Sequence, residues 1–294
     1  MKQTNFNKQT TQDPVNANPL GKYFRHPKIY ITLAEEFYEE GSLEHTTSHE
    51  YPIYSMTAKD EITMKGPDAL LNGEAVRELI ESCCPNIKNA WKVPSVDIDK
   101  LLIAIRFATY GEYMDRTLKI PNTEEEREFR IDLKHLMASF ENKAFDTLVE
   151  ITDELSAVIR PLTYEEFNSI QMKTFEEQKI LKVINDDSIP DDLKLSEFNK
   201  SFKKLTQITI ESVLYSIVKI VTPETEVTNK EYIVDFIQNA DKDFYQKIIH
   251  HLEQQKLKFQ IKPIVIQTTP EEQQAGAPET FEFPLMFSES DFFA

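Results

Sequence analysis

Apolar positions along the chain switch between two periods, and the switches predict where strands give way to helices. Residues 28–33 and 51–56 are rich in β-branched and aromatic side chains, which predicts two strands that pair across an acidic loop. Pro67 suits the first turn of a short helix over residues 68–71, and residues 74–84 continue with apolar positions at helical spacing. The chain is therefore expected to begin with mixed α and β elements.

The next element is predicted to be a buried helix. Residues 101–105, Phe107 and Ala108 are apolar around most of a helical circumference, which is typical of a helix inside a domain. Ser95 is a good N-cap and Gly111 is a suitable C-terminal stop. The capping residues thus predict a helix of about 15 residues.

Two hairpins are expected after this helix. Residues 117–120 and 128–132 flank a turn-forming segment and predict the first hairpin. Residues 148–151 and 155–159 predict the second one, and the helix-like residues 132–139 lie between the two pairs.

From Thr163 onward the pattern is predominantly helical. Thr163 and Glu166 form a capping-box pattern that begins a helix extending to about residue 184, and Pro190 ends this helical segment. Thr228 and Glu231 repeat the capping-box pattern. Apolar residues recur every three or four positions in a long helix (Phe198, Phe202, Leu205, Ile208, Leu214, Ile217, Ile220) and in a later one (Phe244, Ile248, Leu252). These segments predict a helical bundle with short turns.

The pattern changes again after residue 259. Residues 264–266 and 281–283 predict a terminal hairpin around an Ala-Gly-Ala-Pro loop. Residues 263–294 contain six acidic residues and no Lys or Arg, and they include the apolar pair Phe292 and Phe293. An apolar pair in an acidic segment indicates a docking peptide or a strand added to a neighbouring protein.

Together these patterns predict an α+β protein that is mainly helical, with small β-hairpin elements and a C-terminal hairpin. We expect five regions: a flexible N-terminal arm (1–26), a mixed α/β region (27–115), a small β region (116–160), a helical region (161–259), and a C-terminal hairpin with an acidic tail (260–294).

Charge and composition narrow the classes of function. The chain has 294 residues, of which 40% are hydrophobic, enough for one large or two modest domains. Its net charge of −17 disfavours binding to nucleic-acid phosphates. No stretch approaches the roughly 18 consecutive apolar residues of a membrane helix, and the first residues lack the apolar core of a secretion signal. We therefore expect no nucleic-acid or membrane partner.

The residues that could carry chemistry favour plain structural roles. Cys83 and Cys84 are adjacent, so they provide neither a disulfide framework nor a four-cysteine zinc site, and Cys83 is expected to be a small buried apolar residue in a reducing cytoplasm. His45 and His49 have the separation of metal ligands on a helix but lie in a predicted loop. The acidic groups at 35–36, 39–40 and 124–126, and the pair His250-His251, are interpreted as solvated.

No Walker A, G-x-S-x-G, H-E-x-x-H or G-x-G-x-x-G motif is present. We accordingly expect no catalytic residue, no cofactor and no metal. Trp91 has two interpretations, a near-core aromatic or an anchor of a protein interface.

Four motifs carry a resemblance to a known family. They are Tyr54-Ser-Met-Thr-Ala-Lys-Asp-Glu61, Gly66-Pro-Asp-Ala-Leu-Leu-Asn-Gly73, Glu81-Ser-Cys-Cys-Pro-Asn-Ile-Lys-Asn-Ala-Trp91 and Leu102-Ile-Ala-Ile-Arg-Phe-Ala-Thr-Tyr-Gly111. Together they resemble the baseplate hub proteins of T4-like bacteriophages. The similarity continues more weakly at 160–164, 236–259 and 292–294, and so spans most of the chain after residue 27.

The resemblance implies a protein that builds or forms the central hub of a contractile-tail baseplate and has no catalytic activity. Some relatives carry Cys-x-x-Cys pairs at two hairpins. The matching turns here, at 121–126 and 268–272, contain no cysteine, so metal binding is not carried over.

The predicted function is protein binding to other hub, baseplate and tail proteins, in the host cytoplasm during assembly and in the baseplate of the virion tail. A structural subunit of the virion and a transient assembly chaperone of the hub are the two alternatives, and a hub-associated cell-wall hydrolase is the rival from another class. Self-association is left open. Residues Trp91, Met56, Lys59, Asp60, Phe292 and Phe293 are the predicted partner-binding residues.

Overall fold

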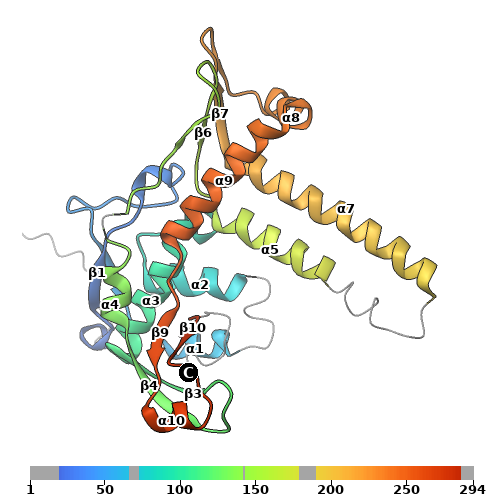
Figure 1. Ribbon diagram of the computed structural model, residues 1–294. Helices are drawn as coiled ribbons and strands as arrows, with labels where there is room; N and C mark the ends of the chain where they lie inside the picture. The colour runs from blue at the N-terminus through green and yellow to red at the C-terminus, as the bar shows by residue number, and fades with distance from the viewer. Residues whose placement is uncertain (1–19, 66–72, 142, 179–189, 286–294) are drawn as a thin grey trace, which may run out of the picture.

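The computed structural model describes residues 20–65, 73–141, 143–178 and 190–285, which form helices joined to several small antiparallel sheets (Figure 1). The α+β class predicted from the sequence is confirmed. The helices are α1 (Ala58–Met64), α2 (Glu74–Cys83), α3 (Ser95–Tyr110), α4 (Leu133–Ala138), α5 (Tyr164–Gln178), α7 (Asp191–Ser216), α8 (Lys230–Asn239), α9 (Lys242–Phe259) and α10 (Pro270–Gln274), with short 3-10 turns at Gly21–Tyr23, Glu35–Phe37 and Ala90–Lys92.

The described strands form four antiparallel sheets. β1 (Pro27–Ile31) pairs with β2 (Tyr51–Tyr54), β3 (Tyr113–Lys119) pairs with β4 (Glu126–Asp132), and β9 (Ile264–Gln267) pairs with β10 (Thr280–Phe283). The fourth sheet has the order β5 (Leu148–Glu150), β6 (Ser156–Ile159), β7 (Ile217–Val221) and β8 (Glu226–Val227). All four predicted hairpin pairings are confirmed by these registers.

Helix α3 is the centre of the first hydrophobic core. Leu101, Ile103 and Ile105 are completely buried, as the apolar run predicted. The helix begins at Ser95, with Pro94 in the N-cap position, and stops at Gly111, whose φ of 97° suits glycine. Side chains from both ends of the described chain pack in the same cluster, from Ile31 in β1 to Ile261 and Leu285 near β9 and β10.

A second core lies between the four-stranded sheet and helices α7, α8 and α9. Val149 and Ile159 of the sheet meet Val213, Ile233 and Ile248 of the helices there. Figure 1 shows this part beside the first core, with α9 running back toward β9.

One helical prediction is wrong at its C-terminal end. Ile217 and Ile220, which fit the spacing of the long helix, lie instead in β7, where they are buried in the second core. The run Ile-Val-Lys-Ile-Val is rich in β-branched residues, which suit a pleated strand, and β6 offers it a complete hydrogen-bonding partner. The region 161–259 is thus not helical throughout.

Of two further predicted helix caps, one is confirmed by the structure and one is wrong. Thr163 and Glu166 form the predicted capping box at α5, because each backbone N–H is bonded to the other side chain. At α8 the cap is Asn229, whose side-chain oxygen accepts from the Glu231 N–H at 2.8 Å, and not Thr228. The predicted helix over residues 68–71 and the part of the α5 helix beyond Gln178 lie outside the described residues.

Helices α5 and α7 project together from the rest of the molecule (Figure 1). Polar contacts join them along this projection: Lys173 is 2.8 Å from Glu211, and Glu177 accepts from Ser201 at 2.6 Å and from Lys204 at 2.7 Å. Their outer halves are therefore held to each other largely through charged and polar side chains.

Charged residues of α3 fasten the chain before β2 to the core. The buried Asp97 carboxylate accepts from the Ala34 N–H at 2.9 Å and from the Tyr38 hydroxyl at 3.2 Å. Burial raises the pKa of Asp97 to about 6, although these hydrogen bonds and the nearby Lys100 act in the opposite direction. Burial also raises the pKa of Asp99 to about 6.

A pH-dependent stability follows from the Asp97 carboxyl. Because its pKa is higher in the folded chain than in the unfolded chain, the folded state holds more protons between about pH 4 and pH 6, and the free energy of unfolding falls as pH rises through that window. At about 1.4 kcal/mol per pKa unit, Asp97 accounts for a decrease of about 3 kcal/mol. Urea unfolding at several pH values should show that the decrease is smaller by the Asp97 contribution in Asp97→Asn, in which Asp99 still titrates; an unchanged slope would contradict the assignment.

Candidate partner-binding surface

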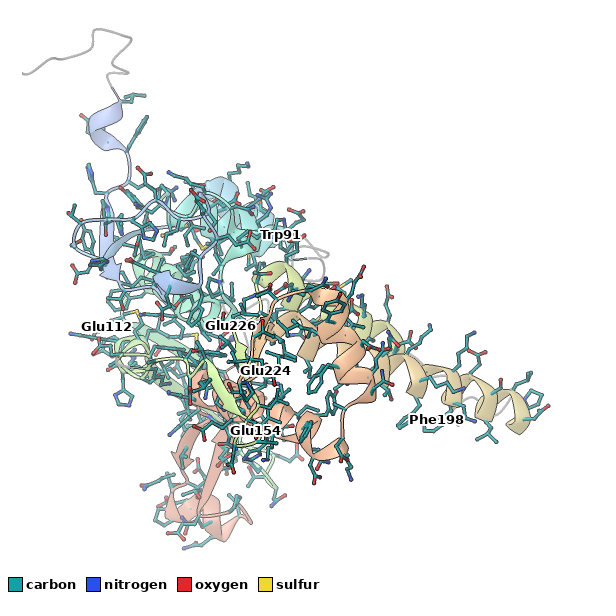
Figure 2. The ribbon with its side chains drawn as sticks, turned by 90° about the horizontal axis from the view of Figure 1, so that it is seen from above. Trp91, Glu112, Glu154, Phe198, Glu224 and Glu226 are labelled. Atoms are coloured by element: carbon teal, nitrogen blue, oxygen red, sulfur yellow. The ribbon has the colours of Figure 1, made fainter. Side chains whose placement is uncertain are left out.

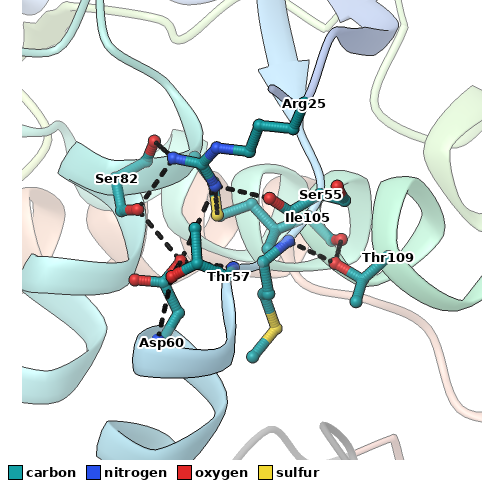
Figure 3. A network of polar contacts seen from close by, with 9 residues as sticks. Arg25, Ser55, Thr57, Asp60, Ser82, Ile105 and Thr109 are labelled. Carbon is teal, nitrogen blue, oxygen red and sulfur yellow. Dashed lines mark hydrogen bonds and ion pairs between the residues drawn. The ribbon is translucent and has the colours of Figure 1, made fainter. Parts of the chain in front are cut away.

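The first predicted site lies around α1, where a polar network joins three segments (Figure 3). Arg25 donates to the carbonyl oxygen of Ser55 and, at 2.6 Å, to that of Ser82. Asp60 lies 3.6 Å from the Arg25 guanidinium and accepts from the Ser82 hydroxyl at 3.0 Å and the Thr57 N–H at 2.7 Å. The network therefore ties the segment before β1 to the start of α1 and the end of α2.

This network decides which predicted residues reach the surface. Met56 and Asp60 are both buried, and the Met56 N–H donates to the Thr109 hydroxyl of α3 at 2.9 Å. Lys59, in the first turn of α1, is exposed. Of these three predicted partner-binding residues, Lys59 presents its side chain to solvent, whereas Met56 and Asp60 hold the surface that carries it.

The position of Trp91 fits both interpretations, a near-core aromatic and an anchor of a protein interface. Its ring stacks on Tyr164 with centroids 5.3 Å apart and 18° between the planes, and it packs against the first core while staying partly exposed. Next to it, Lys92 lies 3.5 Å from Glu39 and 3.3 Å from Glu165. The rigid 3-10 turn and the stacked Tyr164 thus hold a half-buried tryptophan at the surface among charged groups.

The loop histidines gather around one carboxylate. Nδ1 of His45 and of His49 lie 3.2 and 3.0 Å from Glu35 Oε2, and the Tyr51 hydroxyl donates to Oε1 at 2.7 Å. Burial opposes ionisation of Glu35, but the hydrogen bonds from Tyr51, His49 and His45 outweigh it and lower its pKa. Both imidazoles are exposed, as predicted, and within the described ranges no group of three acidic, His or Cys residues is arranged to hold a metal ion.

The remaining chemical candidates are engaged or buried. Burial raises the pKa of both Cys83 and Cys84 to about 12, so neither thiol is a ready nucleophile. Glu124 pairs with Lys119 at 3.1 Å at the tip of the β3–β4 hairpin.

Side chains missed by the sequence reasoning lie along α7. Phe198 and Phe202 were expected to face a bundle core, yet they are 45% and 61% exposed, and Figure 2 shows Phe198 on the projecting part of α7. Their spacing indicated an apolar stripe but did not show that nothing in the described part of the chain would cover it. Glu154, Glu224 and Glu226, also labelled in Figure 2, lie at or next to the tips of the β5–β6 and β7–β8 turns. Phe292 and Phe293 lie outside the described residues.

Comparison with known proteins supplies the family. The sequence matches the family described as T4 bacteriophage base plate protein over residues 43–272, which is more than half of its 294 residues. The chain belongs to this family. No curated protein and no solved structure matches it.

Membership of the T4 baseplate family agrees with the geometry described above. The matched range takes in both hydrophobic cores almost completely, together with Trp91 and the projecting helices α5 and α7. A baseplate protein is a structural component of the virion tail and works by contacting other tail proteins. Within the described residues, no helix is both long and apolar enough to cross a membrane.

Removing the Asp60 carboxylate should destabilise the fold. In Asp60→Ala the Thr57 N–H, the Ser82 hydroxyl and the partly buried Arg25 lose their common acceptor. Because Arg25 keeps some contact with water, we expect a loss of about 2 kcal/mol in the free energy of unfolding, below the full cost of breaking a buried pair. Chemical denaturation measures it, with Glu44→Ala, at the exposed Glu44–Lys88 pair, as control. Equal stability of the two variants would show that the network contributes nothing.

Proposed function

We propose that this baseplate protein is a structural subunit of the baseplate hub and stays in the virion tail. The observation that carries the proposal is the family match over residues 43–272, combined with the hub-like motifs that form the centre of the first core. Three of these motifs lie in the described residues, where they supply the first half of α1, the end of α2 with the 3-10 turn at Trp91, and the second half of α3, and they include the buried core residues Cys83, Ala90 and Ile105.

Protein binding, and not catalysis, is the activity that the described surface supports. The candidate carboxylate Glu35 is held by two histidines and a tyrosine, and the candidate thiols are buried. By contrast, Trp91 and Lys59 present partly or fully exposed groups on rigid turns, as an interface anchor needs. We assign contacts with other hub proteins to Trp91 and Lys59, and a docking role to Phe292 and Phe293.

Assembly in the host cytoplasm precedes the virion in this proposal, and the high negative charge supports an ordered process. A net charge of −17 keeps free copies apart until a partner of opposite local charge neutralises part of it. The same property suits a chaperone that leaves after the hub has formed, so the two alternatives have to be separated by composition of the finished particle.

Mass spectrometry of an affinity-tagged chain separates the alternatives. The tagged chain is captured from infected cells and is also measured in purified virions. We expect the chain at a fixed stoichiometry in virions, together with baseplate proteins. Capture with hub precursors but absence from virions would identify an assembly chaperone, and absence from both would overturn the hub assignment.

A matched variant tests the binding face in the same assay. Trp91→Ala removes the half-buried aromatic while Tyr164 and the 3-10 turn remain, and we expect its recovery in virions to fall several-fold as a hot-spot anchor would require. Tyr232→Ala, an exposed aromatic on α8, serves as the control. Full incorporation of a folded Trp91→Ala chain would remove Trp91 from the interface.

A further inference from the structure

The projecting part of α7 carries an apolar stripe whose aromatic side chains are exposed. Leu195, Phe198, Phe202 and Leu205 follow one another at helical spacings of three and four, so they share one side of the helix. Leu195 and Phe202 are each 61% exposed, and the rings of Phe198 and Phe202 stack with centroids 6.4 Å apart. Clustered exposed apolar and aromatic side chains indicate a surface that binds another chain.

The residues of α7 that bond to α5 are polar. Ser201 and Lys204 bond to Glu177, and Glu211 bonds to Lys173. Within the described residues, this packing leaves Phe198 and Phe202 45% and 61% exposed.

The segment around the stripe is locally rich in lysine, and two of its lysines are paired: Lys200 lies 3.6 Å from Glu197 and Lys204 lies 2.7 Å from Glu177. Between Leu193 and Gln207 the sequence has four lysines and one glutamate, whereas the whole chain carries a net charge of −17. Lys194 and Lys203 lie beside the stripe on its two edges. A segment that combines aromatic residues with carboxylates would match both features.

One segment of this chain has that chemistry. Residues 286–294, Met-Phe-Ser-Glu-Ser-Asp-Phe-Phe-Ala, contain three phenylalanines and two carboxylates and no Lys or Arg. We propose that the stripe Leu195–Phe198–Phe202 of one copy binds residues 286–294 of a second copy. The inference deepens the proposed function, on which it rests for the need to bind protein, by naming self-association through a head-to-tail contact.

A second copy, and not the same one, supplies the segment because of the places where the two parts lie. Leu285, which directly precedes the segment, is buried in the first core beside β9 and β10. Figures 1 and 2 show the end of β10 and the outer part of α7 in separate parts of the molecule.

A symmetric contact between two stripes fits less well. It would bring the lysines of one α7 against those of the other, and like charges at close range oppose association. The head-to-tail contact instead pairs lysines with Glu289 and Asp291. The two arrangements differ in a way that mixed variants reveal.

The test is sedimentation velocity of the full chain and two variants. We expect the wild-type chain to self-associate as its concentration is raised. Phe202→Ser lacks the stripe, and the double variant Phe292→Ser with Phe293→Ser lacks the segment, so each alone should sediment as a monomer. A mixture of the two variants should form a heterodimer, because one supplies an intact segment and the other an intact stripe. Tyr232→Ser, which changes an aromatic that is 66% exposed on α8, should associate as the wild type does.

Each other result overturns the proposal. A wild-type chain that stays monomeric would show that the segment binds within its own copy or not at all. Association of the Phe292 and Phe293 double variant would point to a symmetric stripe contact, and variants that are monomeric alone and do not pair in the mixture would exclude the head-to-tail geometry. Circular dichroism confirms that each variant is folded.

The sedimentation test of this contact and the virion test of the proposed function can fail independently of each other. If the two variants associate in the mixture but the chain is found neither in virions nor with hub precursors, the head-to-tail contact is retained and the hub assignment is rejected. Chain in virions with no self-association would retain the hub assignment and reject the contact.

Discussion

Burial of α3 is the constraint on which the first core depends. A helix that is enclosed on nearly all sides must also enclose its charged residues, and each of these needs a partner because an unpaired buried charge costs several kcal/mol. Asp97 finds the Ala34 N–H and Tyr38, and the Lys100 ammonium finds the Thr32 carbonyl at 2.7 Å. These partners all lie in one stretch after β1. The charges of α3 thus determine where the chain before β2 must run.

The Arg25–Asp60 network extends the same principle to the outer layer. Arg25 bonds to carbonyl oxygens at the end of β2 and of α2, which have no neighbour in their own elements at that point. Asp60 caps α1 from within and faces Arg25 at the same time. One guanidinium and one carboxylate therefore fix three element ends, and the surface that carries Lys59 is rigid because the residues beneath it are satisfied.

Local sequence signals predicted most helices and hairpins. Contacts between residues far apart in the sequence determined the parts that were predicted wrongly or left open. The apolar run was sufficient for α3, although Ser95 is its first helical residue and not the predicted N-cap, and local signals also gave the capping box of α5 and every hairpin. The spacing of Ile217 and Ile220 fits a helix and not the alternation of a regular strand, but the segment pairs with β6, some sixty residues earlier by numbering, in a register with an irregularity between Val158 and Ile159. The sequence placed Trp91 at a surface turn or in the core; its half-buried stack on Tyr164 depends on α5, which no local pattern connects to it.

The exposure of Phe198 and Phe202 likewise depends on contacts between distant segments, and the proposed binding role of α7 rests on it. An apolar stripe on a helix predicts a buried face only when a neighbour exists to cover it, and α5 contacts α7 through Ser201, Lys204 and Glu211 instead. Because the outer half of α7 contributes nothing to either hydrophobic core, its aromatic residues are free of the packing constraints that determine Ile103 or Ile248. Substitutions there can therefore change association without changing stability, which is the separation of folding from binding that an assembling subunit requires.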